Sequence, residues 1–165
     1  MLAASCGGGG DEPVSVDDYA NDLCTALRDW SEELRGRQTE LQEGAALGAS
    51  PEGARAALQQ FVDGAAAATT DLGEAIDEAG EPDTEGGAEV ADAFQSAIDD
   101  TSEELEAARG EVGELPTGSA SEYRAAVDGF VTELRTSLEG FGQHFEDVDA
   151  PELETALDEA EACGP

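Results

Sequence analysis

The sequence predicts an all-α protein, an antiparallel up-down four-helix bundle with a short fifth helix at the C-terminus. Three observations support this prediction. Four long stretches place apolar residues at alternating spacings of four and three, the period of one buried helix face. Short turns containing Gly or Pro separate these stretches, which favours antiparallel neighbours. No segment alternates apolar and polar residues for long enough to predict a strand.

The first two helices are predicted from their apolar stripes and end signals. The first spans about 27 residues from Val16, with Gly44, Gly48 and Ser50 breaking it, and its stripe is Val16, Ala20, Leu23, Leu27, Trp30, Leu34 and Leu41. Ser50-Pro51-Glu52 begins the second, because Ser is a capping residue and Pro suits a first helical turn. Gly80-Glu81-Pro82 ends it. Its stripe is rich in small residues, which lets a neighbouring helix approach closely: Ala54, Leu58, Phe61, Ala65, Ala68, Leu72, Ile76 and Ala79.

The remaining helices have similar signals. Asp83 or Thr84 is expected to cap the third and Pro116 to stop it. Ser119, with Glu122 three residues later, forms a capping-box pattern that opens the fourth. A short fifth helix is expected from Pro151 through Leu153, Leu157 and Ala160. The third stripe is Val90, Phe94, Ile98, Thr101, Leu105, Ala108, Val112 and Leu115, and the fourth is Tyr123, Val127, Phe130, Leu134, Leu138, Phe141 and Phe145. The stripes are expected to share one core, with Leu23, Phe61, Phe94 and Phe130 together.

The charge of the chain excludes one class of partner. The 165 residues include 40 acidic residues against seven Arg and no Lys, which gives a formal net charge of −33. A protein that binds the phosphate backbone of a nucleic acid needs clustered cations, so no nucleic-acid partner is expected. The same charge makes it unfavourable for the protein to lie flat on an anionic lipid surface. An acidic surface of this kind suits contacts with proteins or polycations.

Residues 1–14 lack apolar periodicity and are interpreted as the rest of a signal and a flexible tether, so the bundle domain is assigned to 15–165. Leu2-Ala3-Ala4-Ser5-Cys6, followed by Gly7 to Gly10, resembles the end of a bacterial lipoprotein signal. The resemblance implies that Cys6 is acylated and that a membrane is a partner through this anchor. Met1 leaves no room for the basic and apolar segments of a signal, so we expect the reading frame to begin further upstream. The alternative is a cytoplasmic protein that starts at Met1.

The other two cysteines are expected to form a disulfide. If Cys6 carries lipid, Cys24 and Cys163 remain as an even pair, which an oxidising compartment favours. The bridge would place the start of the first helix beside the end of the last, as an even number of long antiparallel helices allows. The alternative is two reduced, buried thiols.

The chain also resembles a class of small helical lipoproteins common in actinobacteria. The residues that carry this resemblance are Tyr19-x4-Cys24-x5-Trp30, the Gly80-Glu81-Pro82 turn before a Gly pair, and a Cys at the C-terminus. The resemblance implies an extracytoplasmic location and supplies no activity.

The single histidine, His144, is a weak candidate for metal binding. Gly142-Gln143-His144-Phe145-Glu146-Asp147 is close to the Gly-x-His-x-x-Glu pattern of imelysin-like envelope proteins, with Asp147 in place of the Glu. A site would need further ligands from other helices, so the favoured interpretation is a solvent-facing His near a helix end. One His cannot build a ferritin-like di-metal centre or bis-His haem ligation.

Other candidate sites are weaker. Glu81, Asp83, Glu85 and Asp92 follow the rhythm of a calcium loop, but this segment is interpreted as a turn and a helix start. Trp30 and the aromatic stripe of Phe130, Phe141 and Phe145 are interpreted as core. No nucleophilic triad and no Gly-rich phosphate loop occurs in the sequence.

The sequence therefore predicts a non-enzymatic cell-envelope lipoprotein, an acidic helical bundle that acts as an interaction or structural module without a cofactor. The alternative is an extracytoplasmic bundle that binds a ligand or a metal, in an interhelical cavity lined by Ala and Phe or near His144. A hydrolase with carboxylate chemistry is the third class.

Overall fold

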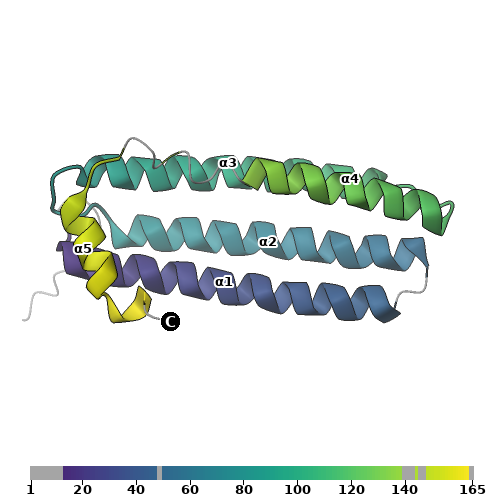
Figure 1. Cartoon of the computed structure of the whole chain (residues 1–165), viewed down its shortest axis with the longest axis horizontal. Helices are drawn as coiled ribbons and strands as arrows, with labels where there is room; N and C mark the ends of the chain where they lie inside the picture. Colours follow the sequence, from purple (N-terminus) through teal and green to yellow (C-terminus); the bar gives the residue numbers. More distant parts are fainter. Residues whose placement is uncertain (1–12, 48–49, 139–143, 145–147, 164–165) are drawn as a thin grey trace, which may run out of the picture.

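In a computed structural model the chain forms an elongated antiparallel bundle of helices (Figure 1). The structure describes residues 13–47, 50–138, 144 and 148–163. The predicted fold, four long helices and a short fifth, is confirmed. No helix in these ranges has both the length and the apolar character to cross a bilayer. The elements are α1 (Val16–Leu47), α2 (Pro51–Ala79), α3 (Gly87–Glu114), α4 (Ala120–Leu138), α5 (Pro151–Glu159) and the short 3-10 helix η2 (Glu161–Cys163).

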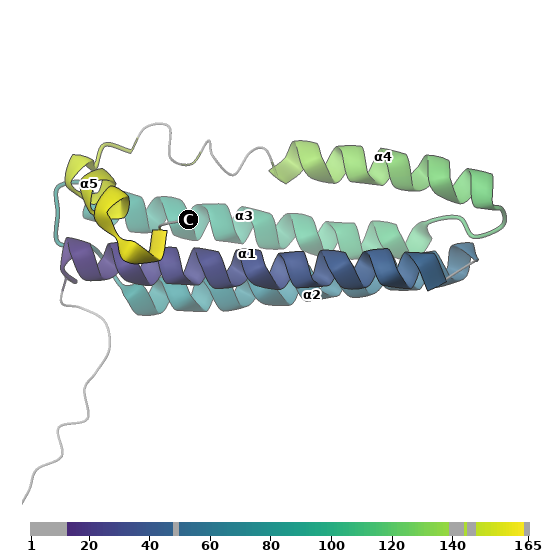
Figure 2. The ribbon, with the colours of Figure 1, turned by 60° about the horizontal axis from the view of Figure 1, so that its bottom comes forward.

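The helices differ in how much of the rod they cover. α2 packs against both α1 and α3 along the length of the rod. α4 lies beside α3 over one half of the rod only (Figure 2). α5 crosses the opposite end and packs on α1, and η2 continues onto α1 as well. All four long helices are therefore present at the α4 end of the rod, whereas α5 covers the other end.

The predicted starts of α2 and α4 are confirmed by their capping bonds. The Ser50 hydroxyl accepts a hydrogen bond from the Gly53 amide at 3.3 Å, and Pro51 is the first helical residue. The Ser119 hydroxyl accepts from the Glu122 amide at 3.3 Å and donates to the Glu122 carboxylate at 2.7 Å. Each bond satisfies an amide that has no partner within its helix.

One predicted helix end is wrong. α1 continues through Gly44 to Leu47 instead of breaking at Gly44. A Cβ at Gly44 would lie 3.0 Å from the Ala57 Cβ, so Gly here permits a close contact with α2. The fourth helix is predicted to reach Phe145, and α4 is described as far as Leu138. Phe141 and Phe145 lie outside the described residues.

Neither predicted residue caps α3. The N-cap is Gly86, in the left-handed region at φ 82°, and it makes no side-chain cap bond. The Thr84 hydroxyl instead donates to a Glu152 carboxylate oxygen at 2.7 Å, which ties this loop to α5. The end of α3 at Glu114, two residues before Pro116, agrees with the prediction.

The loop between α2 and α3 is also bonded to Val14, two residues before α1. The Val14 amide donates to the Glu81 carbonyl at 2.8 Å, and the Asp83 amide donates to the Val14 carbonyl at 2.7 Å. Pro82, between these two partners, is fully buried. Val14, which the sequence assigned to the tether, is therefore bonded to the folded domain.

The core is divided into two clusters, so the prediction of one shared core is wrong. Leu23 is buried in the cluster at the α5 end, and Phe94 packs against that cluster. Phe130 is buried in the cluster at the α4 end, against which Phe61 packs. α4 contributes only to the second cluster, while α5 contributes only to the first. α4 and α5 thus complete two separate parts of the core.

We predict opposite effects of Gly→Ala at two positions of α3. A Cβ at Gly87 would collide with the Pro82 carbonyl group, whose carbon lies 3.1 Å away. Gly87→Ala is therefore expected to lower the free energy of unfolding by about 1–3 kcal/mol. Gly110 has nothing within 4 Å of an added Cβ. Gly110→Ala is expected to raise the same quantity by about 0.5–1 kcal/mol, because Ala loses less backbone entropy in a helix. Urea unfolding measures both, and a stabilising Gly87→Ala would contradict the observed loop packing.

Candidate functional site

The structure brings the two predicted disulfide partners together. Cys24 lies in α1 and Cys163 ends η2, with 139 residues of separation and Cα atoms 5.1 Å apart. This separation lies within the range of disulfides, and the sulfurs are within bonding distance. Cys24 is buried and Cys163 is exposed. The bridge holds the C-terminal segment against α1 at the end of the rod where α5 lies.

Cys6, the predicted site of lipid attachment, lies outside the described residues. The nearest landmark in the fold is Val14, which is bonded to the α2–α3 loop. α5 packs at the same end of the rod, where the hydroxyl of Thr84 in this loop donates to Glu152 of α5. The described chain therefore begins at the end where the disulfide lies.

His144 does not face solvent at a helix end as expected. Its Nε2 lies 3.1 Å from an Asp100 carboxylate oxygen of α3, and its side chain is only 25 % exposed. Asp147, the other candidate ligand, lies outside the described residues. Within the ranges that the structure describes, no group of three or more His, Cys, Asp and Glu side chains is placed to hold a metal ion.

The segment with the calcium-loop rhythm is a turn and a helix start, as favoured from the sequence. Gly86 caps α3, and the loop backbone around Pro82 is bonded to Val14. A hollow of about 370 Å³ lies beside it, lined by Glu85, Gly86, Glu89, Asp149 and Pro151. These carboxylates do not form a metal-holding group in the part of the chain described.

A groove between α1 and α2 was not found by sequence reasoning. Two hollows, of about 320 and 340 Å³, adjoin each other because both are lined by Ala26, Asp29 and Ala75. We name them together the α1–α2 groove. Its apolar residues are mostly alanines that are buried or half-buried, whereas its carboxylates are exposed. The lining consists of Asp22, Thr25, Ala26, Asp29, Trp30, Glu33, Ala68, Asp71, Leu72, Ala75, Glu78 and Ala79.

The carboxylates of the α1–α2 groove are largely without cations. Glu33 is paired with Arg37 at 2.7 Å, and Asp29 has only a long contact with Arg28, at 3.8 Å. Asp22, Asp71 and Glu78 take part in none of the ion pairs found among the described residues. The groove therefore combines an apolar floor with an uncompensated acidic rim.

Trp30 belongs partly to the core and partly to this groove. It packs against the cluster at the α5 end, as predicted, but is only half-buried and lines the groove. Its indole N–H donates to the hydroxyl of Thr69, a buried residue of α2, at 3.3 Å. This bond fixes the indole against α2. No Phe lines the groove, so it differs from the interhelical cavity lined by Ala and Phe that the sequence suggested.

Comparison with known proteins gives no further assignment, because no family model, no curated protein and no solved structure matches the chain. The chemistry of the groove is therefore argued from its own residues.

Tyr19 has an unusual place in the core at the α5 end. Tyr19 is fully buried, and its hydroxyl has no hydrogen-bond partner. Burial raises the pKa of its phenol from 10.0 to about 12, because the charged phenolate is poorly solvated there. A buried polar group without a partner destabilises the fold by about 1–3 kcal/mol.

We predict that Tyr19→Phe stabilises the protein and removes part of its alkaline sensitivity. The folded state holds the Tyr19 proton more tightly than the unfolded state. The ionisation of Tyr19 therefore leaves the free energy of unfolding unchanged below pH 10 and lowers it as the pH rises from 10 towards 12. The variant is expected to raise the free energy of unfolding at pH 7 by about 1 kcal/mol. Tyr123→Phe is the control. Urea unfolding between pH 8 and about 11.5 measures the loss, and an unchanged alkaline loss in Tyr19→Phe would refute the assignment.

We also predict that the bridge stabilises the fold through the long loop it closes. Replacing both Cys24 and Cys163 by Ser is expected to lower the free energy of unfolding by about 2–5 kcal/mol. A thiol reductant should destabilise the unmodified chain to the same extent and leave the double variant unchanged. If the oxidised chain and the double variant unfold at the same urea concentration, the bridge does not form in solution.

Proposed function

We propose that this chain is a non-enzymatic lipoprotein of a bacterial cell envelope, held to the membrane through acyl chains on Cys6, and that its acidic bundle binds cationic partners. The main support is the arrangement of the three cysteines. Cys24 and Cys163 lie within disulfide distance, which leaves Cys6 as the odd cysteine. Structural disulfides are typical of oxidising compartments outside the cytoplasm. An unpaired Cys followed by a Gly run is consistent with lipid attachment.

The position of Val14 supports an anchor at one end of the rod. Val14 is bonded to the α2–α3 loop, at the end of the bundle that α5 closes. An anchor ahead of Val14 holds the rod by that end. The sides of α1, α2 and α3 then stay accessible to partners.

The charge distribution supports binding of cations. The chain carries a net charge of −33, and three carboxylates of the α1–α2 groove have no cation in the described structure. A field of this sign attracts cationic partners and accelerates their association at low ionic strength.

We predict that Cys6 alone determines attachment. When the full upstream reading frame is expressed in a bacterium, the intact mass of the membrane-bound product should show a cleaved, acylated chain that begins at Cys6. Cys6→Ser should abolish acylation and release the chain from membranes. The Cys24→Ser/Cys163→Ser variant is the control and should remain acylated.

The cationic part of the proposal is tested on the same material. Neutral phosphatidylcholine vesicles that carry the acylated chain should bind polylysine at low ionic strength, and vesicles mixed with the Cys6→Ser chain should not. An unmodified, unprocessed product would overturn the lipoprotein assignment. If vesicles that carry the acylated chain bind no polylysine, the assignment of cationic partners is overturned.

A further inference from the structure

We propose that the α1–α2 groove binds a linear aliphatic polyamine, with ammonium groups at its carboxylates and methylene segments over its alanines. This inference rests on the proposed function in one respect, that the partner is a cation. It adds the site and the chemical class of the ligand.

The groove matches the shape of an elongated molecule. The lining extends from Asp22 to Glu33 along α1 and from Ala68 to Ala79 along α2. At the helical rise each wall is about 16 Å long. The two hollows share residues, so one ligand can extend through both. An extended polyamine has this form, whereas a compact ion would fill only part of the groove.

The carboxylates of the groove are spaced along each helix like the charges of such a molecule. Asp22 and Asp29 are seven residues apart on α1, and Asp71 and Glu78 are seven apart on α2. Seven residues are about two helical turns, so members of each pair lie on one helix face at a rise of about 10 Å. The terminal ammonium groups of an extended triamine with propyl and butyl spacers are separated by a similar distance. The lining between them is Thr25 and Ala26 on α1 and Leu72 and Ala75 on α2, a mostly apolar surface that suits methylene groups.

The groove also combines unpaired carboxylates with one aromatic ring. Asp22, Asp71 and Glu78 have no cation among the described ion pairs, so a ligand ammonium need not displace an internal partner. Trp30 lines the same groove and is held by its bond to Thr69. An indole ring held beside a cation site adds a cation–π attraction.

A basic peptide suits this groove less well. The walls are two helices whose backbone groups are bonded within each helix, so they offer no pairing to the main chain of an extended peptide. A polyamine has no carbonyl or amide groups that lose water without a partner. The apolar lining between the carboxylates favours a ligand that is alkyl between its charges.

The test is a titration of the full chain with spermidine at low ionic strength. Trp30 is the only Trp of the chain, so its fluorescence reports on the groove directly. A saturable change is expected. The groove variant Asp71→Asn/Glu78→Gln should weaken binding about tenfold, the effect of losing two exposed ion pairs. Circular dichroism should show the same helix content in each variant.

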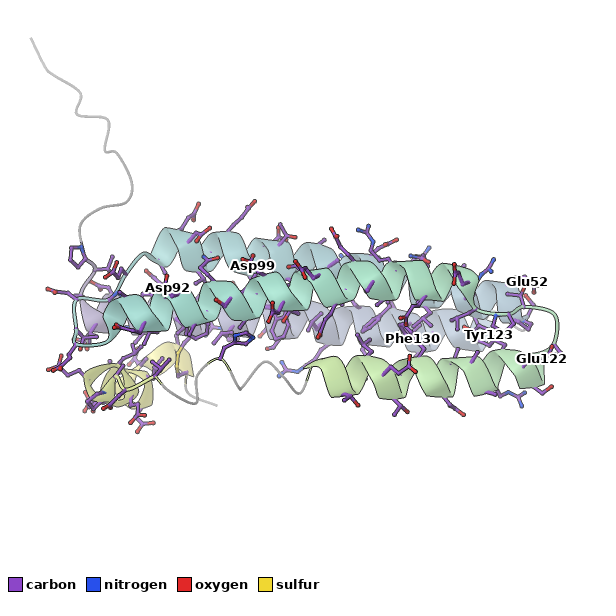
Figure 3. All side chains as sticks on the ribbon, turned by 90° about the horizontal axis from the view of Figure 1, so that it is seen from above. Glu52, Asp92, Asp99, Glu122, Tyr123 and Phe130 are labelled. Atoms are coloured by element: carbon purple, nitrogen blue, oxygen red, sulfur yellow. A yellow bond between two sulfur atoms is a disulfide. The ribbon has the colours of Figure 1, made fainter. Side chains whose placement is uncertain are left out.

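The matched control removes the same charge from a different helix. Asp92 and Asp99 are exposed, seven residues apart on α3, and belong to none of the ion pairs described (Figure 3). Asp92→Asn/Asp99→Asn should change spermidine affinity by roughly twofold at most, because exposed charges at a distance are screened. Hexaamminecobalt(III), measured by calorimetry, carries the charge of spermidine without methylenes and should bind more weakly.

The outcomes separate this inference from the proposed function. Equal weakening by the two double variants would show diffuse attraction and overturn the groove as the site, while leaving an acidic module that binds cations. Equal affinity for hexaamminecobalt(III), or tighter binding of a lysine-rich peptide with the same dependence on Asp71 and Glu78, would overturn the polyamine as the ligand. Absence of a saturable response would overturn the inference, whatever the result for Cys6.

Discussion

Small side chains let α2 approach both α1 and α3 closely, and the shape of the molecule follows from these contacts. A Cβ at Gly44 of α1 would lie 3.0 Å from Ala57 of α2, and a Cβ at Gly73 of α2 would lie 3.0 Å from Ile98 of α3. Each Gly in a helix lowers helix stability by about 1 kcal/mol relative to Ala, which the closer packing offsets. Four alanines line the junction of α1 and α2 beside Trp30 and Leu72, and their small side chains leave part of it unfilled. The α1–α2 groove is therefore a direct result of the packing that holds the helices together.

Two arginines link α2 to α3. Arg109 of α3 is bonded to Asp63 of α2 at 2.6 Å. Arg55 of α2 donates to the Gly113 and Leu115 carbonyls, where α3 ends. Both partners of the Arg109–Asp63 pair are nearly half exposed, so this pair contributes about 1 kcal/mol at most. The stability of the bundle consequently depends mainly on the two apolar clusters and on the link between Cys24 and Cys163.

Features that depend on neighbouring residues could be predicted from the sequence. Ser50 and Ser119 lie next to the amides that they cap, and Pro151 begins α5 because its fixed φ suits a first turn. The pairing of Cys24 with Cys163 followed from counting cysteines, and an even number of long antiparallel helices allowed it. Features that depend on distant residues were missed. A Cβ at Gly86 would lie 2.5 Å from the Asp149 carbonyl oxygen, a contact with a segment more than sixty residues away.

The candidate site shows the same division. The sequence located Trp30 on the buried stripe, and the ring does pack on the core. It could not show that Thr69, on another helix, holds the indole beside exposed carboxylates. The signal that was available is the small-residue stripe of α2 facing a helix with Asp22 and Asp29 just outside its apolar positions. That pattern predicts close helices with charged margins, but not whether the junction is filled.

The groove lies in the same half of the molecule as Val14. Asp22 is eight residues beyond Val14, so the groove begins about 12 Å along α1 from the start of the fold. Seven residues separate Cys6 from Val14, and a stretch of that length spans at most about 25 Å. In the proposed arrangement the groove therefore stays within a few tens of Å of the bilayer. The field of an anionic lipid surface decays over about 8 Å at physiological salt, so the carboxylates attract polycations mainly through their own charge, and the tether determines only where those cations are held.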